Sequence, residues 1–360
     1  MKLIIQIPCY NEAETIGRTI RDLPKSVPGF DTVEYLVIDD GSRDDTAEKA
    51  ASLGVHHVVR HPSNLGLARA FQTGLDCSLR FCADVIVNTD ADNQYPGRYI
   101  AALTAPIVQR RADVVIGNRQ TDTIEHFSAV KRFLQRVGTA TVRKLSGTDV
   151  EDAPSGFRAY SREAALRLAV LSRFSYTLET IIQAGKSGLT ITNVPITTNP
   201  PLRDSRLHKG TAQFVFRQAS TMLALYAFYE PRRTFMLISI PFLFLGGGAW
   251  ARFIYLHLMN EGGIARHIQS VTIGTGLLVL GALILLFGLL ADIANKHRQL
   301  TQLVLFRLRK LEYRLFAGDE GVAVRQVVSA RQEPLAAPAR PPSGTPGRGQ
   351  RLADTGSAAP

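Results

Sequence analysis

Two aspartates that stand two residues apart, Asp90 and Asp92, are the residues best suited to chemistry in this sequence. They follow a short β-branched run at residues 85–87, which predicts a buried strand. In an extended segment a spacing of two places both carboxylates on the same face, where they repel each other and favour a cation between them. Oxygen-only ligands at the end of a strand suit Mg²⁺ or Mn²⁺ that also carries substrate phosphates. A solvated acidic turn is the alternative.

Strands and helices alternate through the first half of the chain, and this pattern positions the aspartates. The expected strands are residues 3–7, 35–38, 58–59, 85–87 and 113–116, with a late strand at 191–196. Asn11 with Glu14, and Ser42 with Asp45, are predicted as capping pairs for the helices after the first two strands. The alternation predicts an α/β fold with a mostly parallel sheet and helices on both faces.

Each predicted strand ends in polar residues. They are Asn11 and Glu12, Asp39 and Asp40, Asp90 and Asp92, and Asn118 and Arg119. Ligands of open parallel sheets bind outside the carboxyl ends of the strands, so four such ends favour one shared site. The glycine-rich motifs G-x-G-x-x-G and G-x-x-x-x-G-K-[ST] are absent, which argues against a dinucleotide-binding dehydrogenase and a P-loop NTPase. Carboxylates at the second strand end can accept hydrogen bonds from a ribose or a base, while a metal holds a diphosphate.

Composition narrows the class of partner. The chain has 360 residues and a formal net charge of +11, which admits nucleic acid, anionic lipid or phosphate-bearing substrates. Nucleic acid is not expected, because no basic run is interleaved with aromatic residues. Cys9, Cys77 and Cys82 form no C-x-x-C pair, which favours a reducing compartment, and the scattered histidines disfavour zinc.

Five short motifs occur in order at residues 7–12 (I-P-C-Y-N-E), 38–42 (I-D-D-G-S), 64–67 (N-L-G-L), 90–94 (D-A-D-N-Q) and 117–119 (G-N-R). Together they resemble the family 2 glycosyltransferases of GT-A fold, and within them the polyprenyl-phosphate (dolichol-phosphate mannose synthase-like) branch. The resemblance covers about residues 3–210 and implies a nucleotide-sugar donor linked to UDP or GDP. The nucleotide-binding residues it implies are Pro8, Tyr10, Asn11, Glu12, Asp39, Asp40, Asn64, Gly66, Asp90 and Ala91. The diphosphate and its Mg²⁺ or Mn²⁺ would be served by Asp90, Asp92 and Gln94.

The segment at residues 152–157 (D-A-P-S-G-F) resembles an element that lines the acceptor side in this family. Ser155 and Gly156 would present backbone donors to a sugar or phosphate there, and a tight turn is the alternative. Residues expected on the acceptor or phosphate side are Arg132, Asp152, Ser155, Gly156 and Lys209. Glu179 stands where the family carries a glutamate, and a surface carboxylate is the alternative.

A basic loop at residues 199–209 resembles the family's R…S-K-L loop, with Arg206 where lysine is usual. Arginine keeps the charge but is a planar fork rather than a point charge. Such a loop could close over phosphates, and a solvated basic loop is the alternative. The candidate catalytic residues are Asp92, Arg119, Glu179, Arg203 and Arg206.

Residues 234–258 and 268–291 are each apolar and long enough to span a bilayer. Residues 211–233 are expected to form an amphipathic helix at the membrane surface. Basic residues flank the outer ends of the two spans, so the positive-inside rule predicts a two-span protein of the cytoplasmic membrane. The catalytic domain (1–210) and a basic segment ending in a disordered tail (292–360) would then be cytoplasmic.

The expected reaction is inverting transfer of a sugar to the phosphate of a membrane polyprenyl phosphate. A phosphate monoester has a second pKa near ~6, so neutralising its charge with Arg119, Arg203 and Arg206 matters more than a general base at Glu179. One alternative is a membrane-anchored family 2 enzyme that glycosylates a lipid hydroxyl or a glycan and needs that base. Another is a non-enzymatic nucleotide-sugar-binding membrane subunit. The sequence leaves open whether the chain forms a homo-oligomer and whether it has a flippase partner.

Overall fold

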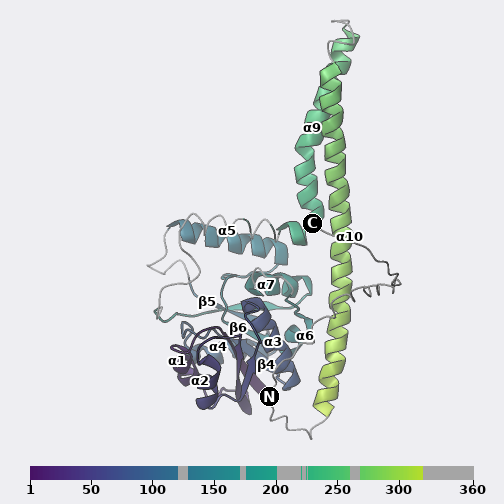
Figure 1. Ribbon diagram of the computed structural model, residues 1–360. Coiled ribbons are helices and arrows are strands. Elements are labelled where there is room, and N and C mark those ends of the chain that lie inside the picture. The colour runs from purple at the N-terminus through teal and green to yellow at the C-terminus, as the bar shows by residue number, and fades with distance from the viewer. Residues whose placement is uncertain are drawn as a thin grey trace, which may run out of the picture.

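An α/β domain and two long helices make up the computed structural model (Figure 1). It describes residues 1–120, 129–170, 176–200, 220, 224, 226–259 and 268–318, with the side chains of the helix at 129–146 described from Arg136. Arg203, Arg206 and Lys209 lie outside the described residues, as do most of the expected surface helix at 211–233 and the tail from 319.

Seven strands form one sheet in the order β3-β2-β1-β4-β6-β5-β7. They are β1 (Lys2–Cys9), β2 (Thr32–Asp39), β3 (His57–Arg60), β4 (Val85–Asn88), β5 (Val114–Asn118), β6 (Arg158–Ser161) and β7 (Ile191–Pro195). All pairs are parallel except those of β6, which runs antiparallel to both β4 and β5. The expected mostly parallel sheet is confirmed. Strand β6 was not among the expected strands, since its four residues, R-A-Y-S, include no β-branched residue.

Helices cover both faces of this sheet. They are α1 (Ile16–Asp22), α2 (Thr46–Ser52), α3 (Leu67–Arg80), α4 (Ile100–Val108), α5 (Ala129–Ser146), α6 (Arg162–Arg167) and α7 (Tyr176–Lys186), with a 3-10 turn at Gly97–Tyr99. Ile4 belongs to one buried cluster, whereas Leu3 and Ile5 belong to the other. Alternate side chains of β1 therefore enter two separate cores, as expected of a strand covered on both faces.

The two neighbours of β1 separate near its carboxyl end. Strand β4 pairs with β1 only as far as Gln6, whereas β2 follows it to Cys9. Pro8 lies beyond the last residue of β1 that pairs with β4, so the N–H that proline lacks is not needed for a hydrogen bond to that strand. The chain places β2 and β3 on one side of β1 and β4 on the other side, so the order of the strands changes direction at β1. Open α/β sheets bind ligands at such a switch point.

Two long apolar helices follow the domain. Helix α9 (Pro231–Leu258) begins slightly before the first expected span, and α10 (Ile268–Gly318) begins where the second was expected. Both are long and apolar enough to cross a membrane. A Cβ on Gly246 would stand 2.9 Å from the Gly274 carbonyl oxygen, so these glycines permit close helix packing.

Helix α10 continues without interruption to Gly318, well past residue 291, where the predicted span ended. Figure 1 shows α9 beside one half of α10 and the α/β domain beside the other half. Strong helix formers fill residues 296–316, without glycine or proline, and allow the helix to continue.

Candidate active site

The loop after β4, which carries the two aspartates, is held from both sides. Thr19 Oγ1 in α1 donates a hydrogen bond to the Ala91 carbonyl oxygen at 2.8 Å. From beyond β7, the backbone N–H of Asn199 donates to the Gln94 carbonyl oxygen at 2.9 Å, and its side-chain amide donates to that of Asn93 at 2.8 Å. Asn93 has a φ of 56°, a left-handed conformation that asparagine tolerates. These contacts fix the carboxylates at the edge of the sheet.

Asp90 has no hydrogen bond or ion pair within the described part of the chain. Burial, followed by the charge of Asp92, raises the pKa of Asp90 to about 7; Glu12 adds to this and Arg119 opposes it. Glu12 follows β1 and Arg119 follows β5. The structure therefore brings the carboxyl ends of β1, β4 and β5 together around one carboxylate.

This donor set fits a hard divalent cation. Asp90 is a buried carboxylate beside Asp92, and carboxylate and amide oxygens are the ligands that Mg²⁺ and Mn²⁺ prefer. No three His, Cys, Asp or Glu side chains in the described ranges come close enough to hold a metal by themselves. Such a site suits an ion whose remaining ligands are substrate phosphates and water. Gln94 remains a predicted ligand.

The raised pKa of Asp90 predicts how stability depends on pH. The folded, metal-free protein holds this proton more tightly than the unfolded chain, in which the pKa is near 3.8. The contribution of Asp90 to the free energy of unfolding should therefore fall as pH rises from about 4 to about 7. We expect Asp90→Asn to raise the Tm of metal-free protein by ~2–4 °C at pH 8 and to leave it unchanged near pH 4. Calorimetry at both pH values, with exposed Asp45→Asn as control, measures the difference; an equal shift at both would contradict it.

Both carboxylate oxygens of Asp40 are engaged within the chain. Oδ1 accepts from the backbone N–H of Leu65 at 2.9 Å and lies 2.7 Å from His61 Nδ1, while Oδ2 accepts from the N–H of Gly66 at 2.8 Å. Asp40 therefore holds in place the loop that carries Asn64. Its direct contact with a nucleotide stays a prediction.

The residues beside Asp40 also shape the second strand end. A Cβ on Gly41, which has a φ of 71°, would lie 2.5 Å from the carbonyl carbon of Ser63, so only glycine fits. Asp39 is fully buried; its Oδ1 accepts from the N–H of Ser42 at 2.9 Å, and its Oδ2 lies 3.1 Å from Arg60 Nε. Asp39 thus anchors its own loop, whereas Asp40 anchors the loop after β3.

The loops after β1 and β2 are joined to each other. The N–H of Asn11 donates to Ser42 Oγ, the N–H of Arg43 to Asn11 Oδ1, and the N–H of Glu12 to Thr46 Oγ1, all at 2.9 Å. The predicted helix caps at Asn11 and Ser42 are wrong, because these side chains bond across the two loops while α1 and α2 begin later in the chain.

Arg119 and Asp152 form a two-pronged ion pair. Arg119 Nε lies 2.7 Å from Asp152 Oδ2 and Nη2 lies 2.9 Å from Oδ1, and the Arg119 backbone N–H donates to Oδ2 at 3.1 Å. The Asp152 side chain is 1% exposed. Asp152 therefore orients the guanidinium, leaving Nη1 without a hydrogen bond among the residues described.

Gly156 lies against Asp90, where a side chain would not fit. A Cβ there would stand 2.8 Å from the hydroxyl of Tyr176 and 3.3 Å from both Asp90 oxygens. The Gly156 N–H donates to Tyr95 Oη at 3.3 Å, and the Ser155 N–H donates to the Asp152 carbonyl oxygen at 3.2 Å. Both amides have internal partners, so the expectation that they present free backbone donors is wrong. Gly156 lies beside Asp90, and the acceptor-side role of this segment stays a prediction.

Arg158 organises the segment at residues 152–157 and was not among the predicted site residues. It is fully buried and donates to the carbonyl oxygens of Ala153, Ser155 and Thr177, at 2.6, 2.8 and 2.7 Å, and to Thr180 Oγ1 at 2.8 Å. One guanidinium thus joins the loop before β6 to the first turn of α7. Arginine early in a strand of four residues gives no sequence signal of this role.

Glu179 is buried in α7 rather than exposed. Its side chain accepts a hydrogen bond from Gln183 Nε2 at 3.0 Å, the residue is 1% exposed, and its charge helps burial to raise the pKa of Tyr229. The alternative of a surface carboxylate is therefore wrong. The charged groups that shift the pKa of Asp90 are Asp92, Arg119 and Glu12, at the ends of β4, β5 and β1.

The predicted site residues fall into four groups. At or just after strand ends are Pro8, Tyr10, Asn11, Glu12, Asp39, Asp40, Asp90, Ala91, Asp92, Gln94 and Arg119, with Asn64 and Gly66 on the loop held by Asp40. On the acceptor-side segment are Asp152, Ser155 and Gly156. Glu179 lies in α7 and is buried. Arg132 lies in α5 with its side chain outside the described residues, as are Arg203, Arg206 and Lys209.

Comparison with known proteins gives relatives for this domain. Residues 4–168 match the family model described as Glycosyl transferase family 2. Glycosyltransferase AglJ of Haloferax volcanii is 30% identical over 313 residues, which cover 82% of this chain and 94% of that protein. Polyprenol monophosphomannose synthase of Mycolicibacterium smegmatis is 30% identical over 207 residues, covering 54% and 77%.

Solved structures that match this chain do so at low identity. Glucosyl-3-phosphoglycerate synthase from Mycobacterium tuberculosis, in complex with Mn²⁺, UDP-glucose and phosphoglyceric acid, is 23% identical with a TM-score of 0.49. The match covers 63% of this chain and 79% of that one. The match to AglJ is the longer one and extends beyond the α/β domain.

Proposed function

We propose, from the premise that this chain belongs to glycosyl transferase family 2, that it transfers a sugar from a UDP- or GDP-linked donor to a membrane polyprenyl phosphate, with inversion at the anomeric carbon. One observation carries the proposal: the carboxylate pair at Asp90 and Asp92 stands at the switch point of a domain that is continuous with two apolar helices. The Mycolicibacterium relative is named for a product of this class.

The donor would lie across the carboxyl ends of β1, β2 and β4. The loops after β1 and β2 are joined through Asn11 and Ser42, so together they can receive the nucleoside as one surface. Its diphosphate would lie over Asp90 and Asp92. A divalent cation bound there would neutralise charge that develops on the leaving diphosphate.

The acceptor phosphate needs positive charge rather than a strong base. Its second pKa is near ~6, so it is already largely ionised at neutral pH. Arg119 meets this need, because Asp152 fixes its guanidinium while Nη1 stays available to a phosphate oxygen. Arg203, Arg206 and Lys209 are proposed to assist, since the chain enters their segment from Asn199, beside the loop that carries the two aspartates.

The membrane arrangement is part of the same proposal. Helices α9 and α10 would form a hairpin that spans the cytoplasmic membrane, with the catalytic domain and the tail in the cytoplasm. Arg232 and Arg233 precede the first span, and Lys296 and Arg298 follow the second, which supports this orientation.

The reaction can be tested with labelled nucleotide-sugars. Membranes that contain the protein are incubated with a panel of UDP- and GDP-sugars and added polyprenyl phosphate. We expect one donor to label a lipid that releases its sugar in mild acid, with a requirement for Mg²⁺ or Mn²⁺. Labelling of glycan or of a neutral lipid alone would instead support the hydroxyl-acceptor alternative. Absence of transfer from every donor would support a binding subunit.

Substitution of Glu179 distinguishes a phosphate acceptor from a hydroxyl acceptor. A hydroxyl nucleophile needs a general base, whose loss costs about 10²–10⁴-fold. Glu179 is buried and accepts a hydrogen bond from Gln183. We therefore expect Glu179→Gln to transfer sugar to the lipid phosphate within about fivefold of the unsubstituted rate. A fivefold change corresponds to less free energy than one hydrogen bond to a charged group contributes. Initial rates of the two proteins measure this. A loss beyond a hundredfold in a folded variant would favour a hydroxyl acceptor.

A further inference from the structure

Residues 292–318 of α10, here called the α10 extension, pack along the α/β domain. The extension contacts α3 and α6. In Figure 1 it continues from the part of α10 that lies beside α9 and passes along one side of the domain. Because the helix is uninterrupted from Ile268, the candidate span and the extension are one element.

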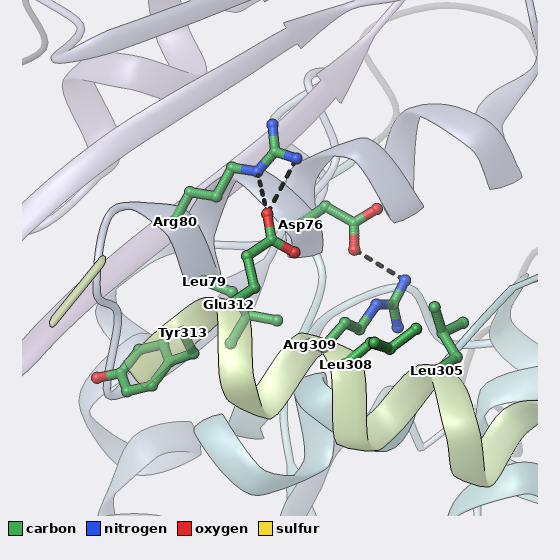
Figure 2. A pocket seen from close by; sticks show the side chains of 8 residues that line it. All are labelled: Asp76, Leu79, Arg80, Leu305, Leu308, Arg309, Glu312 and Tyr313. Carbon is green, nitrogen blue, oxygen red and sulfur yellow. Dashed lines mark hydrogen bonds and ion pairs between the residues drawn. The ribbon is translucent and has the colours of Figure 1, made fainter. Parts of the chain in front are cut away.

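Two ion pairs of opposite polarity join the extension to α3 (Figure 2). Arg309 Nη2 lies 2.9 Å from Asp76 Oδ1, and Arg80 Nε donates to Glu312 Oε1 at 3.2 Å. A slide of one turn would place like charges opposite each other, Arg309 beside Arg80 or Glu312 beside Asp76. The pairing therefore favours one register of the helix against the domain.

Arg309 connects three helices at one point. Besides its pair with Asp76, its Nη1 donates to the carbonyl oxygen of Leu168, which ends α6, at 2.6 Å. Gln72 Nε2 in turn donates to Asp76 Oδ1 at 3.0 Å. The Arg309 side chain is 13% exposed, so little water competes for these bonds.

The surrounding contact is only partly apolar. Arg162 lies over the ring of Tyr313 at 4.6 Å and Arg167 over that of Phe306 at 5.2 Å. A cavity of about 340 Å³ remains beside the ion pairs, lined in part by Leu79 and Leu308 (Figure 2). The charged contacts, rather than dense apolar packing, therefore select how the extension lies on α3.

A second attachment lies nearer the base of the helix pair. Asn295 Nδ2 donates to the carbonyl oxygen of Tyr229 at 3.4 Å, and Arg298 lies over the Tyr229 ring at 4.7 Å. Lys186 of α7 donates to the same carbonyl oxygen at 3.3 Å. A rise of 1.5 Å per residue puts Asn295 and Arg309 about 21 Å apart along α10. One attachment would let the domain swing, whereas two fix its angle to the helix.

We propose that Arg309 and Glu312 are positioning residues, which hold the domain at one height and angle above the bilayer so that the active site meets a membrane-held phosphate. This inference rests on the proposed function. The phosphate of a long isoprenyl lipid is confined to the membrane surface, so a swinging active site would meet it less often. A short, water-soluble isoprenyl phosphate can reach the site at any angle.

Charge reversal tests this with the full chain in lipid vesicles. One variant reverses the domain side, Asp76→Arg with Arg80→Glu, and another reverses the helix side, Arg309→Asp with Glu312→Arg. A third carries all four changes and restores opposite charges across the interface. Each is assayed with a long-chain polyprenyl phosphate in the vesicles and with a short, water-soluble isoprenyl phosphate. Exposed Arg18→Glu on α1 serves as control.

We expect each one-sided variant to lose at least tenfold in transfer to the vesicle lipid and to stay within twofold on the soluble phosphate. The four-fold variant should recover part of the loss, because it restores both ion pairs but not the hydrogen bond from Arg309 to the Leu168 carbonyl oxygen. Equal losses on both acceptors, no loss on either, or no recovery in the four-fold variant would each overturn the inference. If the unsubstituted protein transfers sugar to neither phosphate, the proposed function itself fails, and this control distinguishes the two cases.

Discussion

Replacement of Asp92 by asparagine is expected to lower the rate of sugar transfer by about a thousandfold, the upper range for loss of one electrostatic group in an active site. The change removes one of the two carboxylate charges of the pair formed by Asp90 and Asp92, and should therefore weaken binding of the divalent cation. Rates measured against Mn²⁺ concentration, at saturating donor, give both effects. The fold should persist, because asparagine is isosteric and the Gln94 N–H, which donates to Asp92 Oδ1 at 3.1 Å, keeps an acceptor.

Asp45→Asn is the matched control for this experiment, since it makes the same chemical change at an exposed aspartate. It should turn over at the unsubstituted rate. Normal, metal-dependent turnover by Asp92→Asn would remove the central assignment of the site, whatever the control shows.

Arg119→Met should impair both stability and turnover. It leaves the Asp152 carboxylate buried with no cation beside it, and breaking a buried pair in this way costs about 3–5 kcal/mol. It also removes the guanidinium proposed to meet the acceptor phosphate, for which we expect a further loss of about a hundredfold in rate. Urea unfolding and initial rates, both at a temperature where the variant is folded, measure the two effects.

The double variant Arg119→Met with Asp152→Asn separates these effects. It should regain much of the lost stability, because no unpaired charge remains, yet stay as slow as the single variant. Exposed Arg18→Met controls for loss of one positive charge. Full recovery of turnover in the double variant would show that Arg119 matters only through stability.

Regular features of the sequence predicted the sheet and its active edge. Strand positions follow from short, largely apolar segments of two to six residues, and the carboxyl ends of parallel strands necessarily share an edge. The environment of Asp90 could be anticipated in part from its spacing to Asp92. The contributions of Glu12 and Arg119 depend on distances across the sheet, which spacing along the chain does not contain.

The departures have specific physical causes. Asn11 and Ser42 have the spacing of helix caps, but partners 31 residues apart in the chain compete for the same atoms and take them. Strand β6 depends on a gap between β4 and β5 rather than on its own period. Helix α10 continues beyond its apolar stretch because side chains of its polar half have partners on the α/β domain, such as Asp76 for Arg309. No local pattern in the sequence indicates these partners.

Because α10 is continuous, its length sets the distance and the rotation between the candidate membrane span and the ion pairs with α3. Each residue added or removed between Ala291 and Arg309 would move Arg309 and Glu312 by about 1.5 Å along the helix relative to the candidate span and turn them by about 100°. Charge pairs with α3 survive only if the attachment returns to the same side, which a helix does after about seven residues, or about 10 Å. The length of this segment is therefore restricted to widely spaced values, although its side chains toward solvent are free to vary.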